Sequence, residues 1–447
     1  MDTKKLRQKI LDLAIRGKLV PQDPNDEPAS VLLERIRAEK ERLIKEGKIK
    51  RSKKSASDTP HYENVAFEIP PSWEVSTLSE VFFMHAGKAI SASDIYTEPN
   101  GEHCYLCIGG NGKRGYVRSY NTEGAHPIIG RQGALCGNIN YSEGQFYATE
   151  HAVVVDTFCE TNTWWAYYFL TQLNLNQYAT ATAQPGLSVN TIGDVQIPLP
   201  PIEEQRRIVA AIEKWFALID TLETAKDDLQ TSIVETKSKI LDLAIHGKLV
   251  PQDPNDEPAI ELLKRINPKF TPCDNAHYEN VPSNWALSRV EDIGQLLSGR
   301  DLTNDECNSE NMGLPYLIGA SNIEGDTFSF IRWTEKPQVI SQIGDILISC
   351  KGTIGTIVKN DIGDMHIARQ FMAIRPNTNC ITSDYLHICL ITAIEEIKKD
   401  ARGVIPGISR DDILTKVFTI PPLNEQRRIV AEMNLYYRVF DNISANL

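Results

Sequence analysis

The sequence lacks a long apolar run. No stretch approaches the roughly 18–20 consecutive apolar residues that cross a bilayer, and Met1 to Arg7 do not resemble the start of a secretory signal peptide. We therefore expect a cytoplasmic protein without membrane contacts. Hydrophobic residues at 41% and charged residues at 24% are typical of globular chains, and 447 residues suffice for two or three domains.

Paired cysteines are also lacking. The nine cysteines are an odd number scattered along the chain, which is not the pattern of a disulfide framework. Cys104 and Cys107 form one CxxC, but no second CxxC exists and His103 is the only further ligand close in sequence. Because structural zinc needs four ligands, we predict two residues of an apolar strand here and no metal site.

Catalytic motifs are missing as well. The Pro-Pro pairs at 70–71, 200–201 and 421–422 lack the flanking Asn or Asp and Tyr or Phe with which amino-methyltransferases hold their target amine. Gly109-Gly-Asn-Gly-Lys113 lacks the spacing of a phosphate-binding loop. We predict no catalytic residue and no cofactor in this chain.

Positive charge is scarce overall but unevenly distributed. The net charge is −12, whereas residues 1–54 carry 16 Lys and Arg against 9 Asp and Glu. An acidic chain that binds nucleic acid must therefore use local basic patches, or a partner that contacts the phosphates.

A nearly identical repeat is present. Lys9–Ala29 recurs as Lys239–Ala259, and only one of 21 positions differs, Arg16 against His246. Two shorter matches follow in the same order. They pair His61–Val65 with His277–Val281, and Pro200–Ala210 with Pro421–Ala431.

The repeat predicts a long central helix that begins after Pro201 and ends at Gly247. Apolar residues alternate at spacings of four and three along it, which is typical of a coiled-coil seam. The predicted seam is Ile212, Trp215, Ile219, Leu222, Lys226, Leu229, Ile233, Thr236, Ile240 and Leu243. The C-terminal segment repeats the first half of this helix, and the N-terminal segment repeats the second half. We therefore predict a circularly permuted repeat, in which the two ends form a composite helix antiparallel to the central one.

Two domain-sized inserts, predicted to be α/β, separate the repeated segments. Their candidate strands and helices are Ala152–Asp156, Val195–Leu199, Asp345–Ser349, Phe371–Arg375, Trp164–Asn174 and Ser383–Lys399. The expected organisation is an N-terminal helical region, a first domain, a central helical region, a second domain and a C-terminal helix, at residues 1–65, 66–200, 201–281, 282–420 and 421–447. By the symmetry of an antiparallel pair, the two domains should be related by a pseudo-two-fold rotation.

The two domains share little sequence, whereas the helical segments and the polar loop Pro21–Pro28 are nearly invariant. Identical surfaces beside two dissimilar domains suggest two copies of one partner. A recent duplication of these segments is an alternative explanation.

With its repeated Leu-Ala-Ile-x-Gly-Lys-Leu-Val-Pro-Gln and Pro-Pro-x-x-Glu-Gln-Arg-Arg-Ile-Val segments, the chain resembles the DNA specificity subunits of type I restriction-modification systems over its whole length. The resemblance implies two target-recognition domains that each read half of a bipartite, asymmetric site in double-stranded DNA, with the coiled coil as spacer.

The resemblance also implies partners. Two methylation subunits that bind S-adenosylmethionine would dock on the repeated regions. Two restriction subunits, driven by ATP and Mg²⁺, would complete the restriction complex.

Base readout uses Arg, Lys, Asn or Gln, with phosphate contacts fixing the register. The candidate DNA-binding residues are Lys88, Lys113, Arg114, Arg118, Arg131 and Gln132 in the first domain and Arg300, Lys351, Arg369 and Gln370 in the second. Lys351 aligns with Gln132, Arg300 with Lys88, and Tyr316-Leu317 with Tyr105-Leu106. The candidate partner-binding residues are Lys18, Gln205, Arg206, Arg207, Lys248, Gln426, Arg427 and Arg428.

Two alternatives stay open. The basic segment Lys45–Lys54 fits either a phosphate-contacting arm or a solvated linker. The chain as a whole would also fit a structural coiled-coil adaptor without base-specific readout, which salt-dependent binding to DNA would exclude.

Overall fold

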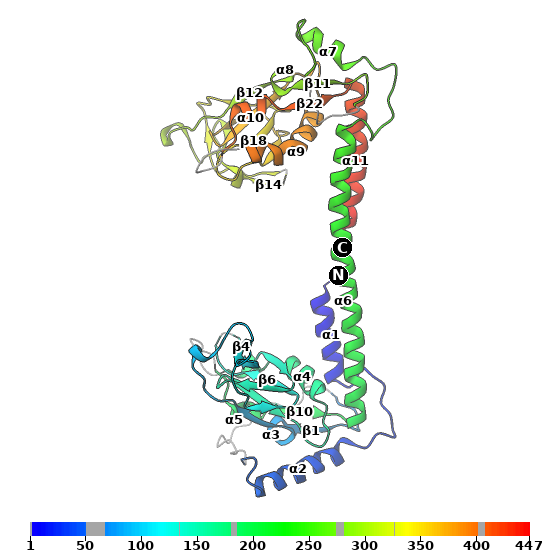
Figure 1. Cartoon of the computed structure of the whole chain (residues 1–447), viewed down its shortest axis with the longest axis vertical. Helices are drawn as coiled ribbons and strands as arrows, with labels where there is room; N and C mark the ends of the chain where they lie inside the picture. Colours follow the sequence, from blue (N-terminus) through cyan, green and yellow to red (C-terminus); the bar gives the residue numbers. More distant parts are fainter. Residues whose placement is uncertain are drawn as a thin grey trace. The chain divides into compact units, whose positions relative to one another are not determined.

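A computed structural model describes residues 2–50, 68–133, 135–179, 186–273, 281–325, 327–400 and 407–447 (Figure 1). The chain divides into two compact units, Met1–Ala225 and Lys226–Leu447. Helix α6, Ile202–Ile245, has 44 residues and contributes to both units. The repeated segment His61–Val65, its counterpart up to residue 280, and residues 51–54 of the basic segment lie outside the described residues.

In unit 1 two helices precede the strands, shorter helices lie between the strands, and the first part of α6 follows them. Its helices are α1 Thr3–Ile15, α2 Ala29–Lys45, α3 Leu78–Val81, α4 Thr163–Gln172, α5 Val189–Gly193 and the first part of α6. Its strands are β1 Glu74–Thr77, β2 Phe83–Ala86, β3 Tyr105–Gly109, β4 Gly112–Val117, β5 Thr122–Glu123, β6 His126–Gly130, β7 Ile139–Ser142, β8 Gln145–Ala148, β9 Ala152–Asp156 and β10 Gln196–Leu199. They form the sheets β2-β9-β6-β7, β4-β3-β8-β5 and β1-β10.

Unit 2 repeats this topology with different residues. Its helices are the rest of α6, α7 Ala259–Ile266, α8 Val290–Ile293, α9 Ser383–Asp400, α10 Arg410–Leu414 and α11 Leu423–Asn446. Its strands are β11 Ala286–Arg289, β12 Gly294–Ser298, β13 Leu314–Leu317, β14 Ile323–Glu324, β15 Thr327–Phe328, β16 Trp333–Thr334, β17 Ile340–Ser341, β18 Ile346–Ser349, β19 Ile357–Lys359, β20 Met365–Ile367, β21 Phe371–Pro376 and β22 Val417–Ile420. The sheets β12-β21-β18-β19, β16-β13-β20-β17 and β11-β22 match those of unit 1 strand for strand, and β14-β15 is an added hairpin.

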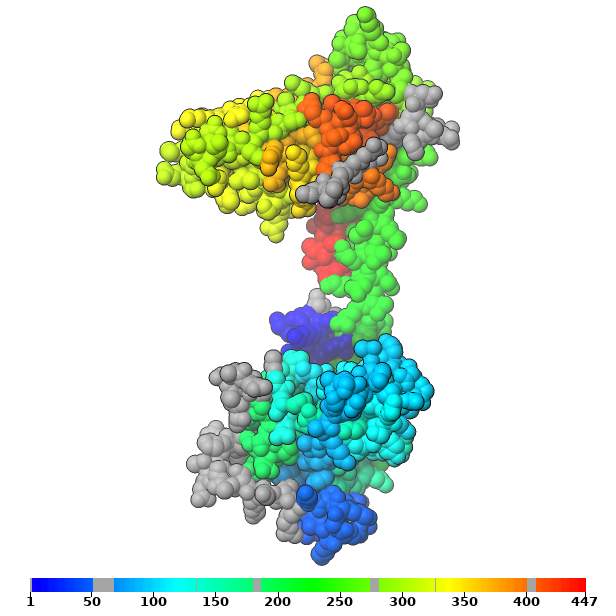
Figure 2. Space-filling model, turned by 60° about the vertical axis from the view of Figure 1, so that its left-hand side comes forward, coloured from blue at the N-terminus to red at the C-terminus, as the bar shows by residue number. Residues whose placement is uncertain are grey.

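A helix packs antiparallel against α6 in each unit. In unit 1 the Arg7 guanidinium of α1 lies 2.5 Å from an Asp220 carboxylate oxygen, while Leu11 and Ala14 belong to the same buried cluster as Ile208 and Ile212. In unit 2 the α11 residue Asp441 pairs with Lys237 at 2.6 Å. Figures 1 and 2 both show blue α1 and red α11 lying along green α6.

Each sheet domain shares its hydrophobic core with these helices. In unit 1 Val153 of β9, Trp165 of α4 and Ile212 of α6 belong to one buried cluster. In unit 2 Ile374 of β21 and Ile240 of α6 belong to another. Because a shared close-packed core resists relative movement, each domain is fixed to its own part of α6.

Gly17 and Gly247 follow the ends of α1 and α6 in the left-handed conformation, with φ of +64° and +66°. A Cβ on either residue would lie 2.4 Å from a proline Cγ, of Pro70 or Pro282. Only glycine meets both demands, the left-handed backbone and the close approach of a proline.

The predicted seam is half wrong. Ile212 and Ile219 are 0% and 1% exposed and Ile233 and Ile240 are also buried, but Trp215, Leu222 and Leu229 are 49%, 50% and 41% exposed. One helix packs on each part of α6, and it covers only one of the two apolar seam positions of each heptad. The other apolar seam position is left exposed to solvent.

The predicted secondary structure is confirmed at the elements named from the sequence. Strand β9 has the predicted bounds, and β10, β18, β21, α4 and α9 differ from the predicted ranges by at most two residues at either end. The continuous apolar runs of the central strands carry a strong signal because these strands are buried on both faces.

Candidate nucleic-acid interface

Three loops of unit 1 meet at one edge of the sheets. They are the end of β3, the turn Arg131–Gly133 after β6, and the turn Thr149–His151 between β8 and β9. The Arg131 amide donates to the His151 carbonyl at 2.9 Å, and the Thr149 amide donates to the Ile108 carbonyl at 2.9 Å. These backbone bonds fix the three loops against one another.

A recess of about 400 Å³ opens between these loops. Its lining is Gly109, Gly110, Asn111, Gly112, Lys113, Arg114, Gln132, Gly133 and His151. Glycine is required where the loops touch, because a Cβ on Gly130 would lie 2.2 Å from the Gly110 carbonyl oxygen.

Five of the six predicted residues of the first domain lie at this edge. Lys113, Arg114 and Gln132 line the recess, Arg131 precedes Gln132, and the Lys88 amide donates to the Ala148 carbonyl at the end of β8. Arg131 is partly used inside the protein, since its Nε donates to the Leu187 carbonyl at 3.3 Å.

Arg118 lies elsewhere. It follows the far end of β4, where it pairs with Glu102 at 2.7 Å and donates to His103 Nε2 at 3.0 Å. The structure does not bring Arg118 together with the other five residues.

Unit 2 builds the same edge. The Cys350 amide donates to the Gln370 carbonyl at 2.7 Å, as Arg131 does to His151, which confirms that Lys351 occupies the position of Gln132. The Arg300 amide donates to the Ile367 carbonyl, as Lys88 does to Ala148. The four predicted residues of the second domain, Arg300, Lys351, Arg369 and Gln370, therefore lie at one edge.

The alignment of Tyr316-Leu317 with Tyr105-Leu106 is wrong by two residues. The Ala368 amide donates to the Leu317 carbonyl where the Thr149 amide donates to Ile108, so Leu317 corresponds to Ile108. The two strands share a Tyr-Leu dipeptide, but at positions that are not equivalent. Backbone pairing, rather than side-chain identity, defines which residues of these strands correspond.

The two edges differ in their side chains. Arg369 pairs with Asp301 at 2.7 Å, whereas the equivalent Glu150 lies 3.3 Å from the His151 ring. The Gln370 side chain extends between Gly319 and Gly352. A Cβ on Gly319 would lie 2.8 Å from the Gln370 Oε1.

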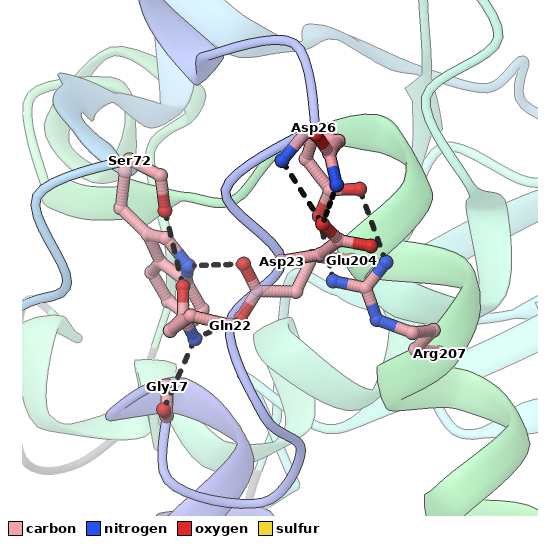
Figure 3. A network of polar contacts seen from close by, with 9 residues as sticks. Gly17, Gln22, Asp23, Asp26, Ser72, Glu204 and Arg207 are labelled. Atoms are coloured by element: carbon pink, nitrogen blue, oxygen red, sulfur yellow. Dashed lines mark hydrogen bonds and ion pairs between the residues drawn. The ribbon is translucent and has the colours of Figure 1, made fainter.

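A second polar cluster, which we call the clamp, lies where α6 begins. The residues shown in Figure 3 link the loop after α1 to α6. Gln22 Nε2 donates to Glu204 at 2.6 Å, Trp73 Nε1 donates to the other Glu204 oxygen at 2.8 Å, and Arg207 binds both Asp26 oxygens at 3.1 and 2.6 Å. Glu204 is fully buried. Burial raises the pKa of its carboxyl, although the hydrogen bonds from Trp73 and Gln22 act in the opposite direction.

Unit 2 has a matching clamp at the start of α11. Gln252 Nε2 donates to the buried Glu425 at 2.6 Å, and Arg428 pairs with Asp256 at 2.6 Å. Glu204 and Glu425 are not among the residues predicted from the sequence, although both lie in the repeated Pro-Pro-x-x-Glu-Gln-Arg-Arg-Ile-Val segment.

The partner-binding assignment of Gln205 and Gln426 is wrong, because both side chains are fully buried. The Gln205 side-chain Nε2 donates to the Pro200 carbonyl. The Gln205 Oε1 accepts from the backbone amide of Asn162, which precedes α4. Gln426 makes the equivalent bonds to Pro421 and Thr382. Arg207 and Arg428 are engaged in the clamps. The exposed residues of the predicted set are Lys18, Arg206, Lys248 and Arg427.

Within the described ranges, no group of three or more His, Cys, Asp or Glu could hold a metal ion. Cys104 is exposed and Cys107 is buried on β3, and His103 is engaged with Arg118. The helices that the structure describes include none that is both long and apolar enough to span a membrane.

Comparison with known families agrees with the duplicated architecture. The model of the type I restriction modification DNA specificity domain matches residues 70–231 and 282–446. The chain belongs to this family. The two matched segments each contain one of the sheet domains and part of the helical region.

Curated relatives of the family are also similar to the chain. The EcoprrI specificity subunit of Escherichia coli is 43% identical over 167 residues, which cover 37% of this chain and 41% of that protein. The EcoEI and EcoAI specificity subunits of E. coli are 27% and 28% identical, over 99% and 96% of this chain and 90% and 88% of their own lengths.

Solved structures share the fold. The HsdS subunit of Thermoanaerobacter tengcongensis has a TM-score of 0.57 at 18% identity, covering 86% of this chain and 93% of that one. A chain from a study of the assembly and conformational transition of a type I restriction-modification system has a TM-score of 0.58 at 18% identity, covering 85% and 94%.

Proposed function

We propose that this chain is the DNA specificity subunit of a type I restriction-modification complex. The domains at residues 66–200 and 282–420 each read one half of a bipartite, asymmetric site in double-stranded DNA. The observation that carries the proposal is the pair of equivalent edges. Their backbone hydrogen bonds are the same, but the side chains at equivalent exposed positions differ, as Gln132 does from Lys351. This is the arrangement expected of two readers of different sequences.

We further propose that the helical regions 1–65, 201–281 and 421–447 form the spacer. In this arrangement α1 and α11 together make a composite helix antiparallel to α6, the repeat is circularly permuted, and the domains are related by a pseudo-two-fold axis. The antiparallel packing of α1 and of α11 within their own units supports it.

The exposed stripe on the helices is the proposed docking surface for two methylation subunits. It consists of Trp215, Leu218 and Leu222 in unit 1 and of the equivalent Tyr436, Val439 and Ile443 in unit 2, all exposed. Exposed apolar side chains in a row are typical of protein interfaces. Two equivalent stripes fit two copies of one partner, and Lys18, Arg206, Lys248 and Arg427 remain candidate polar contacts.

Catalysis belongs, in this proposal, to the partners. The methylation subunits would bind S-adenosylmethionine, and two restriction subunits would use ATP and Mg²⁺. The chain itself would hold no cofactor, and the complex would act on chromosomal DNA in the cytoplasm.

The decisive experiment is co-expression of this chain with its methylation subunit, followed by mapping of methylated adenine across a genome. We expect a bipartite motif with a fixed gap. Replacing residues 282–420 by the second domain of another family member should change one half of the motif and leave the other half and the gap. A continuous motif, or methylation that does not depend on the chain, would contradict the proposal.

An adaptor without base readout is the competing function. It predicts a stable complex with the methylation subunits but no preference among duplexes. Binding of the complex to its mapped site and to a scrambled duplex, at equal salt, separates the two, because specific complexes typically bind their site at least about 10³-fold more tightly than other DNA.

A further inference from the structure

The recess of unit 1 has a chemistry that base reading alone does not explain. It is concave, at about 400 Å³, and three glycines of the β3–β4 turn form one wall. The side chains of Lys113 and Arg114 stand at its border, and both are exposed. Within the part of the chain that the structure describes, neither has an acidic partner within ion-pair distance.

The two cations are held in place by their neighbours. Lys113 Nζ donates to the Tyr116 hydroxyl at 3.0 Å and lies 4.5 Å from the centre of that ring. The Arg114 stem packs on Gly109, where a Cβ would lie 2.7 Å from its Cδ. A glycine at 109 therefore leaves room for the arginine to lie along the wall of the recess.

The surface of duplex DNA decides what such a recess can receive. Base edges lie at the bottom of the major groove, about 8.5 Å deep, and are reached by projecting side chains or elements. Phosphates form the ridges that flank the groove. A concave site with two cations complements a ridge, whereas a projecting turn complements a groove.

The Arg131–Gly133 turn lies directly beside the recess. Gln132 borders the recess, and Leu135, three residues later, is 56% exposed. An amide and an apolar side chain suit base edges and the thymine methyl group. The recess and the turn are thus placed to contact a ridge and the adjoining groove together.

Among the described residues of unit 2, a side chain occupies the position equivalent to the recess. The Gln370 side chain fills the space between Gly319 and Gly352. The residues after Gly319, Ala320 to Asn322, form a 3₁₀ turn without a cation. The feature therefore distinguishes unit 1 from unit 2.

We propose that the Gly109–Arg114 recess of unit 1 receives one backbone phosphate of the DNA duplex, next to the base pairs that the Arg131–Gly133 turn reads. The inference rests on the proposed function and adds a division of labour within one domain. The recess supplies affinity that is independent of sequence and sensitive to salt, while the neighbouring turn supplies discrimination.

The test uses the complex of the full chain with its methylation subunits and the variants Lys113→Gln, Arg114→Gln and the double variant. Both side chains are exposed, so the variants should fold as the wild type does, which thermal unfolding checks. Arg114→Lys keeps the charge. Lys5→Gln removes an exposed charge of unit 1 on α1, away from the recess.

Affinity is measured between about 50 and 200 mM NaCl for the mapped site and for a random duplex. The double variant should weaken binding to both duplexes by the same factor, about tenfold at the lower salt, and reduce the slope of log K against log salt by about 1, as expected for the loss of one phosphate contact. Arg114→Lys and Lys5→Gln should stay near wild type, and the methylated motif should be unchanged.

Duplexes with a single methylphosphonate linkage locate the phosphate. One neutral linkage beside the half-site read by unit 1 should weaken the wild-type complex and have no further effect on the double variant. An unchanged salt slope, a changed base in that half-site, or no linkage with this behaviour would overturn the inference. If the wild-type complex shows no preference for the mapped site, the proposed function fails and the inference fails with it.

Discussion

The clamp and the recognition edge are each present twice in the chain. The side chains named in the two clamps are the same, whereas those of the two edges differ. Glu204, Gln22 and Arg207 of the first clamp have the identical residues Glu425, Gln252 and Arg428 in the second. The edges share backbone hydrogen bonds, while Gln132 is replaced by Lys351 and His151 by Gln370. Where the same side chains recur they make the same Gln–Glu and Arg–Asp contacts, and where only the backbone recurs the side chains are free to serve different ligands.

The largest expected effect tests whether the clamps are equivalent. Glu204→Ala leaves the donors of Gln22 and of the buried Trp73 without their acceptor, and should destabilise unit 1 by about 3 kcal/mol, or roughly 6–12 °C in Tm. Glu425→Ala should have a similar effect on unit 2. Calorimetry of the complex measures the change in stability, and hydrogen exchange shows which of the two units is destabilised.

Glu204→Gln is the matched control, since it keeps an acceptor and should cost about 1 kcal/mol. If Glu204→Ala were neutral while Glu425→Ala was severe, the two clamps would not be equivalent parts.

The second prediction concerns the exposed stripe. Trp215→Ala and Tyr436→Ala should each weaken the binding of one methylation subunit by about 2 kcal/mol, roughly 30-fold in Kd, with little change in stability. Sedimentation of mixtures at several concentrations measures this loss. Val234→Ala, an exposed apolar residue of α6 outside the stripe, should bind normally; equal losses for all three variants would argue against the stripe.

The third prediction concerns the edges. Gln132→Lys gives unit 1 the side chain found at the same position of unit 2, and should change or relax one position of one half-site, by roughly 1–2 kcal/mol of discrimination. Lys351→Gln should act on the other half. Methylation mapping reports both, and a change in the same half-site for both variants would contradict the assignment of one half-site to each unit.

The smallest expected effect comes from a pair of facing strands. His126 and Asp156 face each other across β6 and β9 at 3.1 Å, with His85 at 3.4 Å from the same carboxylate. The equivalent residues of unit 2 are Asp345 and Arg375, at 2.8 Å. Burial lowers the pKa of His126, but its bonds to Asp156 and to backbone carbonyls outweigh this and raise it above the ordinary value.

A raised histidine pKa contributes stability that is present below about pH 6.5 and is lost as pH rises through the folded-state pKa. Unit 1 should therefore lose stability on going from pH 6 to pH 8, and unit 2 should not, because arginine stays charged. The pKa of Asp156 is lowered to about 2 by the two histidines against the effect of burial, so its contribution is lost only below about pH 4. Hydrogen exchange at pH 6 and at pH 8 measures the stability of each unit. His126→Asn should remove the difference in pH dependence between the two units.

The sequence predicts the fold better than the site, for physical reasons that particular residues illustrate. Strand β9 and helix α6 are strong local signals, since an apolar run or a heptad spacing is written in adjacent residues. Which of Ile212 and Trp215 is covered depends on how many helices pack on α6, and no local pattern states that number. The burial of Gln205 likewise depends on the Pro200 carbonyl and the Asn162 amide, which only the folded chain brings to it.

The ion pairs between central strands also set a rule for building chimaeras. A hybrid domain that combined β6 of unit 1 with β21 of unit 2 would place His126 against Arg375, and the reverse hybrid would place Asp345 against Asp156. Both combinations bring groups of like or potentially like charge together inside a sheet. Recognition domains of this chain should therefore be exchangeable as whole cassettes, whereas mosaics cut between these strands should fold poorly.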